Sequence, residues 1–161
     1  MKYSRSAIAE AERTLMQFGA MYVEQPDGTL LVPGDLDLSS KQLFKLPDLS
    51  PVEVAGNFYC YNNFLTSLEG APHKVAKGFY CYNNSLKSLK GAPETVGGEF
   101  WCDVNQLSFL SHAPAAVGSN FHCNDNPLVS LEGAPKSFKK IKSDFGEFKS
   151  WQDIPEHLRV A

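Results

Sequence analysis

The fold is decided by the stretch Phe58-Tyr59-Cys60-Tyr61-Asn62-Asn63-Phe64-Leu65, because the chain carries four copies of its pattern. Each copy begins 21 residues after the previous one and reads Phe-x-Cys-x-x-Asn-x-Leu-x-x-Leu; the copies start at Phe58, Phe79, Phe100 and Phe121. A fixed period in this range predicts a stacked solenoid, because one such unit cannot bury its own apolar side. We therefore expect a β-solenoid in which each copy adds one strand to a shared parallel sheet.

The repeats extend ahead of the four clear copies and are closed at both ends. Leu36 and Leu38 match Phe58 and Cys60 at a spacing of 22 residues, while Lys41 stands where the asparagine would be. Residues 6–18 show a helical apolar pattern and residues 21–32 suit two short strands around a turn, which together can cover an exposed sheet edge. We predict a single domain over residues 1–161, with an N-terminal helix-plus-hairpin cap over 1–31, repeats over 32–142 and a C-terminal cap with a short helix over 143–161.

Side-chain alternation separates the two faces of each repeat strand. Phe58 and Cys60 are expected to point into the core, while Tyr59 and Tyr61 point to solvent. The Asn63 side chain is expected to pair with backbone groups that the following turn leaves open, as a buried amide must.

The unit Phe58-x-Cys60-x-x-Asn63-x-Leu65 resembles the leucine-rich-repeat core Leu-x-Leu-x-x-Asn-x-Leu, with Phe and Cys at the two strand positions. The resemblance covers residues 32–142. The Gly-Ala-Pro variant that follows most copies is similar to short repeats of bacteriophage-encoded proteins and, more distantly, to type III secreted leucine-rich-repeat effectors. This resemblance implies a leucine-rich-repeat β-solenoid with a parallel β-sheet on its concave face, an inward row of asparagines and extended convex segments. It identifies no ligand, and the residues after 142 are too few for the ubiquitin-ligase domain that some of those effectors carry.

Cysteines and histidines are candidate metal ligands, but their spacing does not support a metal site. The sequence has no Cys-x-x-Cys pair and no paired histidine motif, and stacked repeats would place the cysteines in one inward row as small core residues. The residues concerned are Cys60, Cys81, Cys102, Cys123, His73, His112, His122 and His157. Phosphate-loop, dinucleotide and nucleophile-elbow motifs are also missing from the sequence. We expect a non-catalytic protein without a metal or cofactor.

Carboxylates on the concave face leave one catalytic alternative open. Asp103 and Asp125 fall near the ends of adjacent strands, and further outward acidic residues are Asp35, Asp37 and Glu99. A glycoside hydrolase needs two carboxylates about 5 to 9.5 Å apart, a separation that neighbouring strands could provide. A hydrolase that uses these carboxylates is therefore an alternative hypothesis.

The outward strand positions are the candidate binding site. Aromatic residues gather there without a structural need to be apolar, and tyrosine and tryptophan dominate protein-binding hot spots. The simpler interpretation is that these rings stack on their neighbours and stabilise the sheet. We predict that the partner-binding residues are Tyr59, Tyr61, Tyr80, Tyr82, Trp101, Asp103, His122 and Asn124.

The leading hypothesis for function is a protein-binding module that uses the aromatic concave face. The phage-like repeats suggest a phage or prophage accessory protein that engages a bacterial host protein, and inhibition of a defence system is one effect that such binding could have. The alternative from another class is a glycan- or small-ligand-binding protein that stacks sugar rings on Tyr59, Tyr80 and Trp101.

Charge and hydropathy set the expected surroundings. The net charge of −3 gives no strong attraction to nucleic acid or to anionic membranes, even though several lysines cluster between residues 136 and 149. No apolar run is long enough for a membrane span, and the N-terminal residues do not form a secretion signal. We expect a protein in the cytoplasm of a bacterial host cell, with no membrane partner and no nucleic-acid partner.

Overall fold

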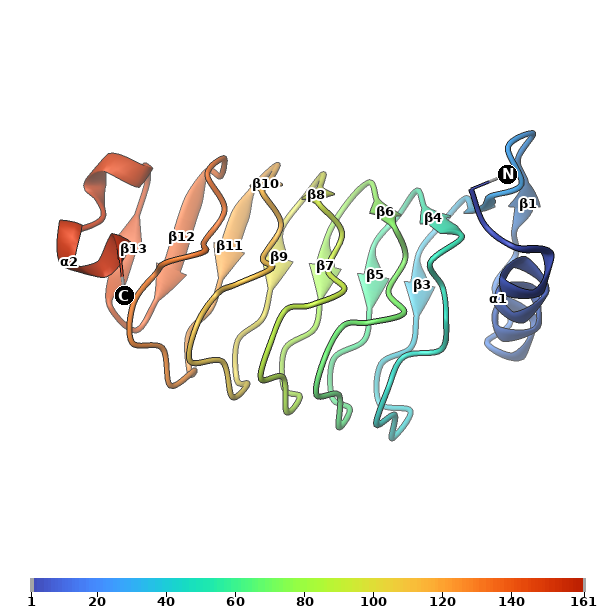
Figure 1. Cartoon of the computed structure of the whole chain (residues 1–161), viewed down its shortest axis with the longest axis horizontal. Helices are drawn as coiled ribbons and strands as arrows, with labels where there is room; N and C mark the ends of the chain where they lie inside the picture. Colours follow the sequence, from blue (N-terminus) through green and yellow to red (C-terminus); the bar gives the residue numbers. More distant parts are fainter. Residues whose placement is uncertain (1, 161) are drawn as a thin grey trace.

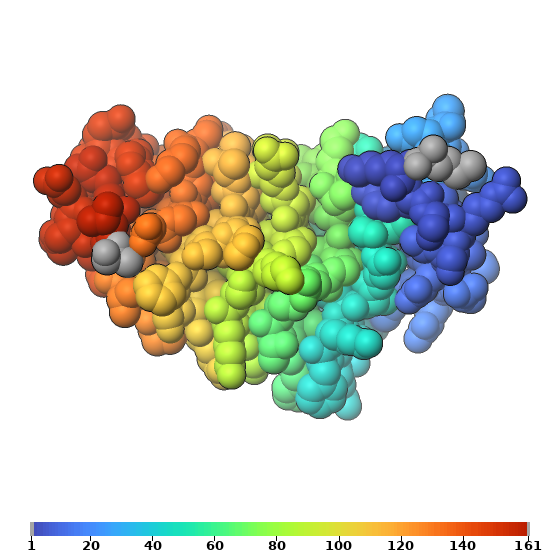
Figure 2. Space-filling view, viewed as in Figure 1, coloured from blue at the N-terminus to red at the C-terminus, as the bar shows by residue number. Residues whose placement is uncertain are grey.

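The computed structural model describes residues 2–160 and shows a β-solenoid of about five turns with a helix at each end (Figure 1). Met1 and Ala161, the outermost residues of the two expected caps, lie outside the described residues. Successive turns form contiguous bands in the space-filling view (Figure 2). The predicted solenoid is confirmed.

The larger sheet has seven strands. In order across the sheet they are β13 (Gly146–Phe148), β12 (Lys140–Ser143), β11 (Asn120–His122), β9 (Phe100–Trp101), β7 (Phe79–Tyr80), β5 (Phe58–Tyr59) and β3 (Leu36–Asp37). All neighbours are parallel except β12 and β13, which form an antiparallel hairpin. The register is the one that the repeat predicts, because Phe58 pairs with Phe79 and Phe79 with Phe100.

The opposite side of the solenoid carries a second sheet, where the sequence predicted only extended segments. Its six strands, in order, are β1 (Val23–Glu24), β2 (Leu30–Val32), β4 (Val52–Val54), β6 (Lys74–Val75), β8 (Thr95–Val96) and β10 (Ala116–Val117). Val54 pairs with Val75 and Val75 with Val96. The constant repeat length keeps these short segments in register, so their backbone groups bond to one another rather than to water.

The core lies between the two sheets. Neighbouring phenylalanine rings have centroids 5.0 to 5.5 Å apart and form a stack through the solenoid: Phe58, Phe79, Phe100 and Phe121. These rings and the four cysteines have no solvent-exposed surface. Complete burial of each phenylalanine stabilises the fold by about 1.5 to 3 kcal/mol, and the buried leucines and valines of the same core add to this.

The asparagines after the strands form a continuous ladder inside the turns, as predicted. The side-chain amide of Asn105 donates to the carbonyls of Cys81 and Cys102 at 3.2 and 3.1 Å, and its Oδ1 accepts from the backbone N–H of Leu86 at 3.0 Å. Asn63, Asn84 and Asn126 make the corresponding bonds. Each amide therefore joins two successive turns.

The N-terminal cap consists of α1 (Arg5–Gln17) and the β1–β2 hairpin. The Ser4 side chain caps the helix by accepting a hydrogen bond from the N–H of Ala7 at 3.1 Å. Ala11 and Leu15 are fully buried and belong to the common core. This end of the solenoid is thus closed by the elements expected there.

The C-terminal end has the short helix that the sequence predicted and, before it, a hairpin that the sequence did not predict. The repeat motif is lost after Phe138, yet β12 continues the larger sheet, with Ile141 paired to Phe121 and fully buried. The strand then turns back as β13 and is followed by η1 (Trp151–Asp153) and α2 (Glu156–Arg159). Ile154 and Leu158 are buried in the core, so the short helical segment closes this end.

Candidate binding surface

The outward side of the larger sheet carries the candidate site, and we call it the outer face. It comprises the outward positions of β3, β5, β7, β9 and β11 and of the residues that flank them. These residues are Asp35, Asp37, Ser39, Asn57, Tyr59, Tyr61, Gly78, Tyr80, Tyr82, Glu99, Trp101, Asp103, Asn120, His122 and Asn124. The strand register brings all eight sequence-predicted binding residues onto this one face.

The first row of the outer face is an aromatic ladder made by Tyr59, Tyr80, Trp101 and His122. Tyr59 stacks on Tyr80 with ring centroids 5.1 Å apart, and Trp101 stacks on His122 at 4.1 Å. Tyr80 and Trp101 are tilted by 50° with centroids 6.0 Å apart. The ring faces are therefore turned along the solenoid axis toward one another.

The second row of the outer face consists of Tyr61, Tyr82, Asp103 and Asn124. Tyr61 and Tyr82 stack with centroids 4.6 Å apart and planes only 6° apart. Asp103 Oδ1 accepts hydrogen bonds from the backbone and side-chain nitrogens of Asn124 at 2.8 and 2.9 Å. Half of this row is thus aromatic and half polar.

The ladder rings lean along their own strands toward the preceding outward residue. A Cβ added at Gly78 would lie 2.6 Å from Cζ of Tyr80, so the ring occupies the space above this glycine. Trp101 leans in the same way and donates from Nε1 to Oε2 of Glu99 at 2.9 Å. Both rings are held in defined positions and are only partly open to solvent.

Partial burial raises the pKa of the phenols, which are neutral at physiological pH in any case. The pKa of Tyr80 is raised, first by burial and then by the charges of Glu99 and Asp35. The pKa of Tyr59 is raised by burial and then by Asp35. At physiological pH these residues present hydroxyl groups that can both donate and accept.

His122 corrects the sequence-based expectation, which placed an exposed histidine at the end of the ladder. Its side chain points outward by register but is only 7% exposed. Burial lowers the pKa of His122, and Lys142 adds to this effect, while Asp103 and Glu99 oppose it. Nε2 lies 3.8 Å from Oε1 of Glu99 and makes no hydrogen bond among the described residues. His122 is therefore a mainly neutral ring at physiological pH, and its approach to Glu99 is not a full ion pair.

The outer face is acidic. Its carboxylates are Asp35, Asp37, Glu99 and Asp103, and none of its residues is Lys or Arg. The nearest cationic strand is β12, where Lys140 is paired with Glu147 of β13 at 2.8 Å and Lys142 lies beside His122 in the strand register. The face therefore combines aromatic edges and hydroxyls with uncompensated negative charge.

The cysteines show the properties of core residues. All four are buried and not disulfide-bonded. Burial raises the pKa of each thiol, and the thiol of Cys102 lies 3.1 Å from the carbonyl oxygen of His122. Within residues 2–160, no group of three or more His, Cys, Asp or Glu side chains is placed to hold a metal ion.

The carboxylates of the hydrolase alternative lie in different environments. Asp103 is committed to Asn124, as described above, whereas Asp125 is exposed in the turn with a φ of 53°. The backbone carbonyl of Asp125 accepts from the N–H of Asn105 at 3.3 Å. Both residues thus have structural roles in linking neighbouring turns.

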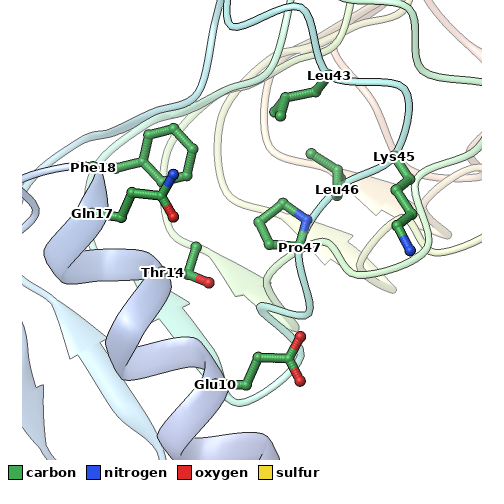
Figure 3. A pocket seen from close by; sticks show the side chains of 8 residues that line it. All are labelled: Glu10, Thr14, Gln17, Phe18, Leu43, Lys45, Leu46 and Pro47. Atoms are coloured by element: carbon green, nitrogen blue, oxygen red, sulfur yellow. The ribbon is translucent and has the colours of Figure 1, made fainter.

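A hollow between α1 and the first turn was not visible from the sequence. It has a volume of about 320 Å³, and Figure 3 shows side chains of α1 and its C-terminal end on one side and those of residues 43–47 on the other, with apolar and charged residues on both sides. The lining includes Phe18, Leu46, Pro47, Glu10 and Lys45. Its walls come from segments far apart in the chain, so no local motif marks it.

An exposed aromatic pair was also missed. Phe44 and Phe64 stack with centroids 5.2 Å apart and are 73% and 50% exposed. They occupy turn positions where the repeat sets no residue type, which is why the repeat pattern gave no signal for them.

Comparisons with family models, curated proteins and solved structures returned no match. The described residues contain no helix that is long and apolar enough to cross a bilayer. Function must therefore be argued from the geometry of the outer face.

Proposed function

We propose that this chain is a non-catalytic module of the leucine-rich-repeat type that binds another protein through its outer face. The observation that carries the proposal is the pair of stacked rows in which five tyrosine and tryptophan rings stand on the solvent side of one sheet. Such residues combine large contact area with few rotatable bonds and dominate protein-binding hot spots.

The asparagine ladder supports the leucine-rich-repeat type. Asn63, Asn84 and Asn105 bond to the backbone of two successive turns, which is the role that the repeat resemblance implies for them. The resemblance implies extended segments on the side opposite the larger sheet, and in this chain such segments pair with one another in a second sheet.

The orientation of the rings favours a protein over a glycan. A sugar ring stacks on an open aromatic face, but the faces of Tyr61 and Tyr82 are turned to each other at 4.6 Å. Ring edges and hydroxyls are left for the partner, which suits the mixed contacts of a protein surface. Three hollows among the described residues have no outer-face residue in their lining, whereas a small ligand would need a concave site on that face.

A bacterial host protein is the partner class that we propose to test first. The support is the similarity of the Gly-Ala-Pro repeats to those of bacteriophage proteins, and inhibition of a host defence protein is one effect such binding could have. The effect on the partner is a separate question from the location of the surface.

The experiment compares the immobilised wild-type chain with two variants as baits in bacterial lysate. The first variant, Tyr80→Ala/Trp101→Ala, trims the outer face, and the second, Lys87→Ala/Glu94→Ala, trims exposed residues elsewhere. We expect a protein that is captured by wild type and by the control but not by the outer-face variant. With the captured protein purified, the outer-face variant should bind about 30-fold more weakly or worse.

Folding is checked by thermal melting of each variant. If the Tyr80→Ala/Trp101→Ala variant melts at a lower temperature than wild type, the variant Tyr80→Ala/Tyr82→Ala replaces it. This second variant leaves the Trp101–His122 stack intact. Full affinity in a folded outer-face variant, together with loss in the Lys87/Glu94 variant, would overturn the proposal.

A further inference from the structure

The carboxylates of the outer face lie at two levels along the solenoid. Asp35 and Asp37 belong to the β3 row, and Glu99 and Asp103 belong to the β9 row, with the tyrosines of β5 and β7 between them. The pKa of Tyr80 is raised by the charges of both Glu99 and Asp35, which places this ring under the influence of both levels.

These carboxylates have hydrogen-bond donors, but among residues 2–160 none of them forms an ion pair with Lys or Arg. Asp35 Oδ1 accepts from the N–H of Asn57 at 2.7 Å, and Asp37 Oδ1 accepts from the N–H of Ser39 at 2.8 Å. Donors of this kind hold a carboxylate in place and leave its charge uncompensated. By contrast, Glu53 and Glu69, away from the outer face, are paired with lysines at 2.6 and 2.8 Å.

One carboxylate keeps an unused acceptor. Asp103 Oδ2 is buried and has no hydrogen-bond partner among the described residues. A buried acceptor without a donor is costly, so a donor brought by a partner would gain more here than at an exposed carboxylate. A partner reaches this oxygen only if the Asp103 side chain rotates, and side-chain rotamer changes are common when interfaces form.

We infer that the partner presents a basic segment to the outer face, with Lys or Arg side chains directed at the two carboxylate levels. This inference rests on the proposed function and names the chemistry of its partner. The aliphatic stems of such side chains can lie on the aromatic edges, while their charged ends reach the carboxylates and the neutral phenol oxygens. An acidic face without cations also steers a basic partner and repels nucleic acid.

The strand spacing sets the separation of the two cations. β3 and β9 are three strand positions apart, which corresponds to about 14 Å. An extended chain covers this distance in about four residues, and an even number directs both side chains to the same side. A segment that crosses the strands with basic residues at positions i and i+4 therefore matches the face.

The test uses a capped nine-residue peptide of Gly and Thr with Arg at its third and seventh positions, titrated into the ¹⁵N-labelled full chain. A matched peptide carries Glu at both positions. We expect the Arg peptide to shift amide resonances of the outer face and to bind about five-fold more weakly or worse when salt is raised from about 50 to 300 mM. The Glu peptide should cause no shift.

The variant Asp37→Asn/Glu99→Gln removes two charges and keeps one acceptor oxygen for Ser39 and one for Trp101, while the acceptor for the Asn120 side chain is lost. It should weaken Arg-peptide binding about five-fold or more, whereas the control Glu69→Gln/Glu94→Gln should not. The inference is overturned if the Arg peptide causes no outer-face shift at about 2 mM, or if the Glu peptide or the neutralised variant binds equally well. Shifts that map to another surface overturn it as well.

The two proposals can fail separately. If the captured partner still binds the neutralised variant with full affinity but not the Tyr80/Trp101 variant, the basic-segment inference is wrong and the binding surface stands. If the partner binds both variants fully, the surface itself is wrong.

Discussion

Trp101 lies on His122, with ring centroids 4.1 Å apart and ring planes 23° apart. Trp101 also donates to Glu99, whose other carboxylate oxygen accepts from the side chain of Asn120 at 3.0 Å. The end of the aromatic ladder is therefore fixed by polar groups of the outer face. A rigid surface of this kind loses little conformational entropy when a partner binds.

The buried His122 should make stability sensitive to acid. Its pKa is lowered from 6.5 in the folded chain, so the unfolded chain binds more protons as the pH falls through this value. The stabilisation is complete above about pH 6.5 and is lost as the pH drops toward the folded pKa. His122→Phe keeps a ring on Trp101 and should lose less stability than wild type in urea unfolding between about pH 7.5 and 5.

The matched control for this prediction is His157→Gln, at an exposed position of α2. It should show the acid loss of the wild type. Some acid loss should persist in His122→Phe, because burial also lowers the pKa of His73. An unchanged pH profile for His122→Phe would contradict the assignment.

Asn105→Ala should damage folding rather than binding. The change removes donors to the carbonyls of Cys81 and Cys102 and the acceptor for Leu86 N–H, all inside the turns. Leaving such buried groups unpaired should cost about 2 kcal/mol or more of unfolding free energy in urea titrations. Gln106→Ala, at the exposed neighbouring position, should change it by less than about 0.5 kcal/mol.

Val104→Asn should stabilise the chain. Val104 holds a φ of 54°, which is unfavourable for a β-branched side chain, and the equivalent positions in the two preceding repeats are Asn62 and Asn83. Asn83 donates to Asn62 at 2.7 Å, and a third asparagine could extend this exposed row. We expect a gain of about 1 kcal/mol in urea unfolding, and a loss of stability would refute the strain argument.

The cysteines should be unreactive in the native chain. All four thiols are buried and burial raises their pKa, so little thiolate is available. A thiol reagent should modify the folded protein only at the rate of unfolding and should label four sites in denaturant. Fast labelling without denaturant would show that the row of cysteines is accessible.

The solenoid and its register follow from the sequence because the same residue types recur at a constant spacing. Phe58, Phe79 and Phe100 can stack only if the turns stack, so the alternation of inward and outward positions follows at once. The eight candidate residues could therefore be placed on one face from the sequence alone. The partner that these residues bind could not be predicted, because the repeat constrains only the inward positions.

The remaining differences arise where packing outweighs the motif. The larger sheet continues into β12 because Ile141 supplies an apolar inward residue at the phenylalanine position, although the rest of the repeat is lost. His122 is buried because Trp101 stacks on it and neighbouring strands flank it. Both outcomes depend on neighbours in space, which a pattern read along the chain does not reveal.

Gly78→Ala tests whether the orientation of the ladder matters for binding. The new Cβ would lie 2.6 Å from Cζ of Tyr80, and the ring can relieve this contact by turning away from the sheet. Because the outer end of a partly exposed side chain yields easily, the unfolding free energy should change by less than about 1 kcal/mol. Partner binding should weaken about ten-fold, since Tyr80 stands at the centre of the two rows. The matched control is Gly34→Ala, where a Cβ meets no atom within 4 Å, and it should bind as wild type does. If the Tyr80 resonances of Gly78→Ala have moved but its affinity for the partner is unchanged, binding does not depend on the orientation of this ring.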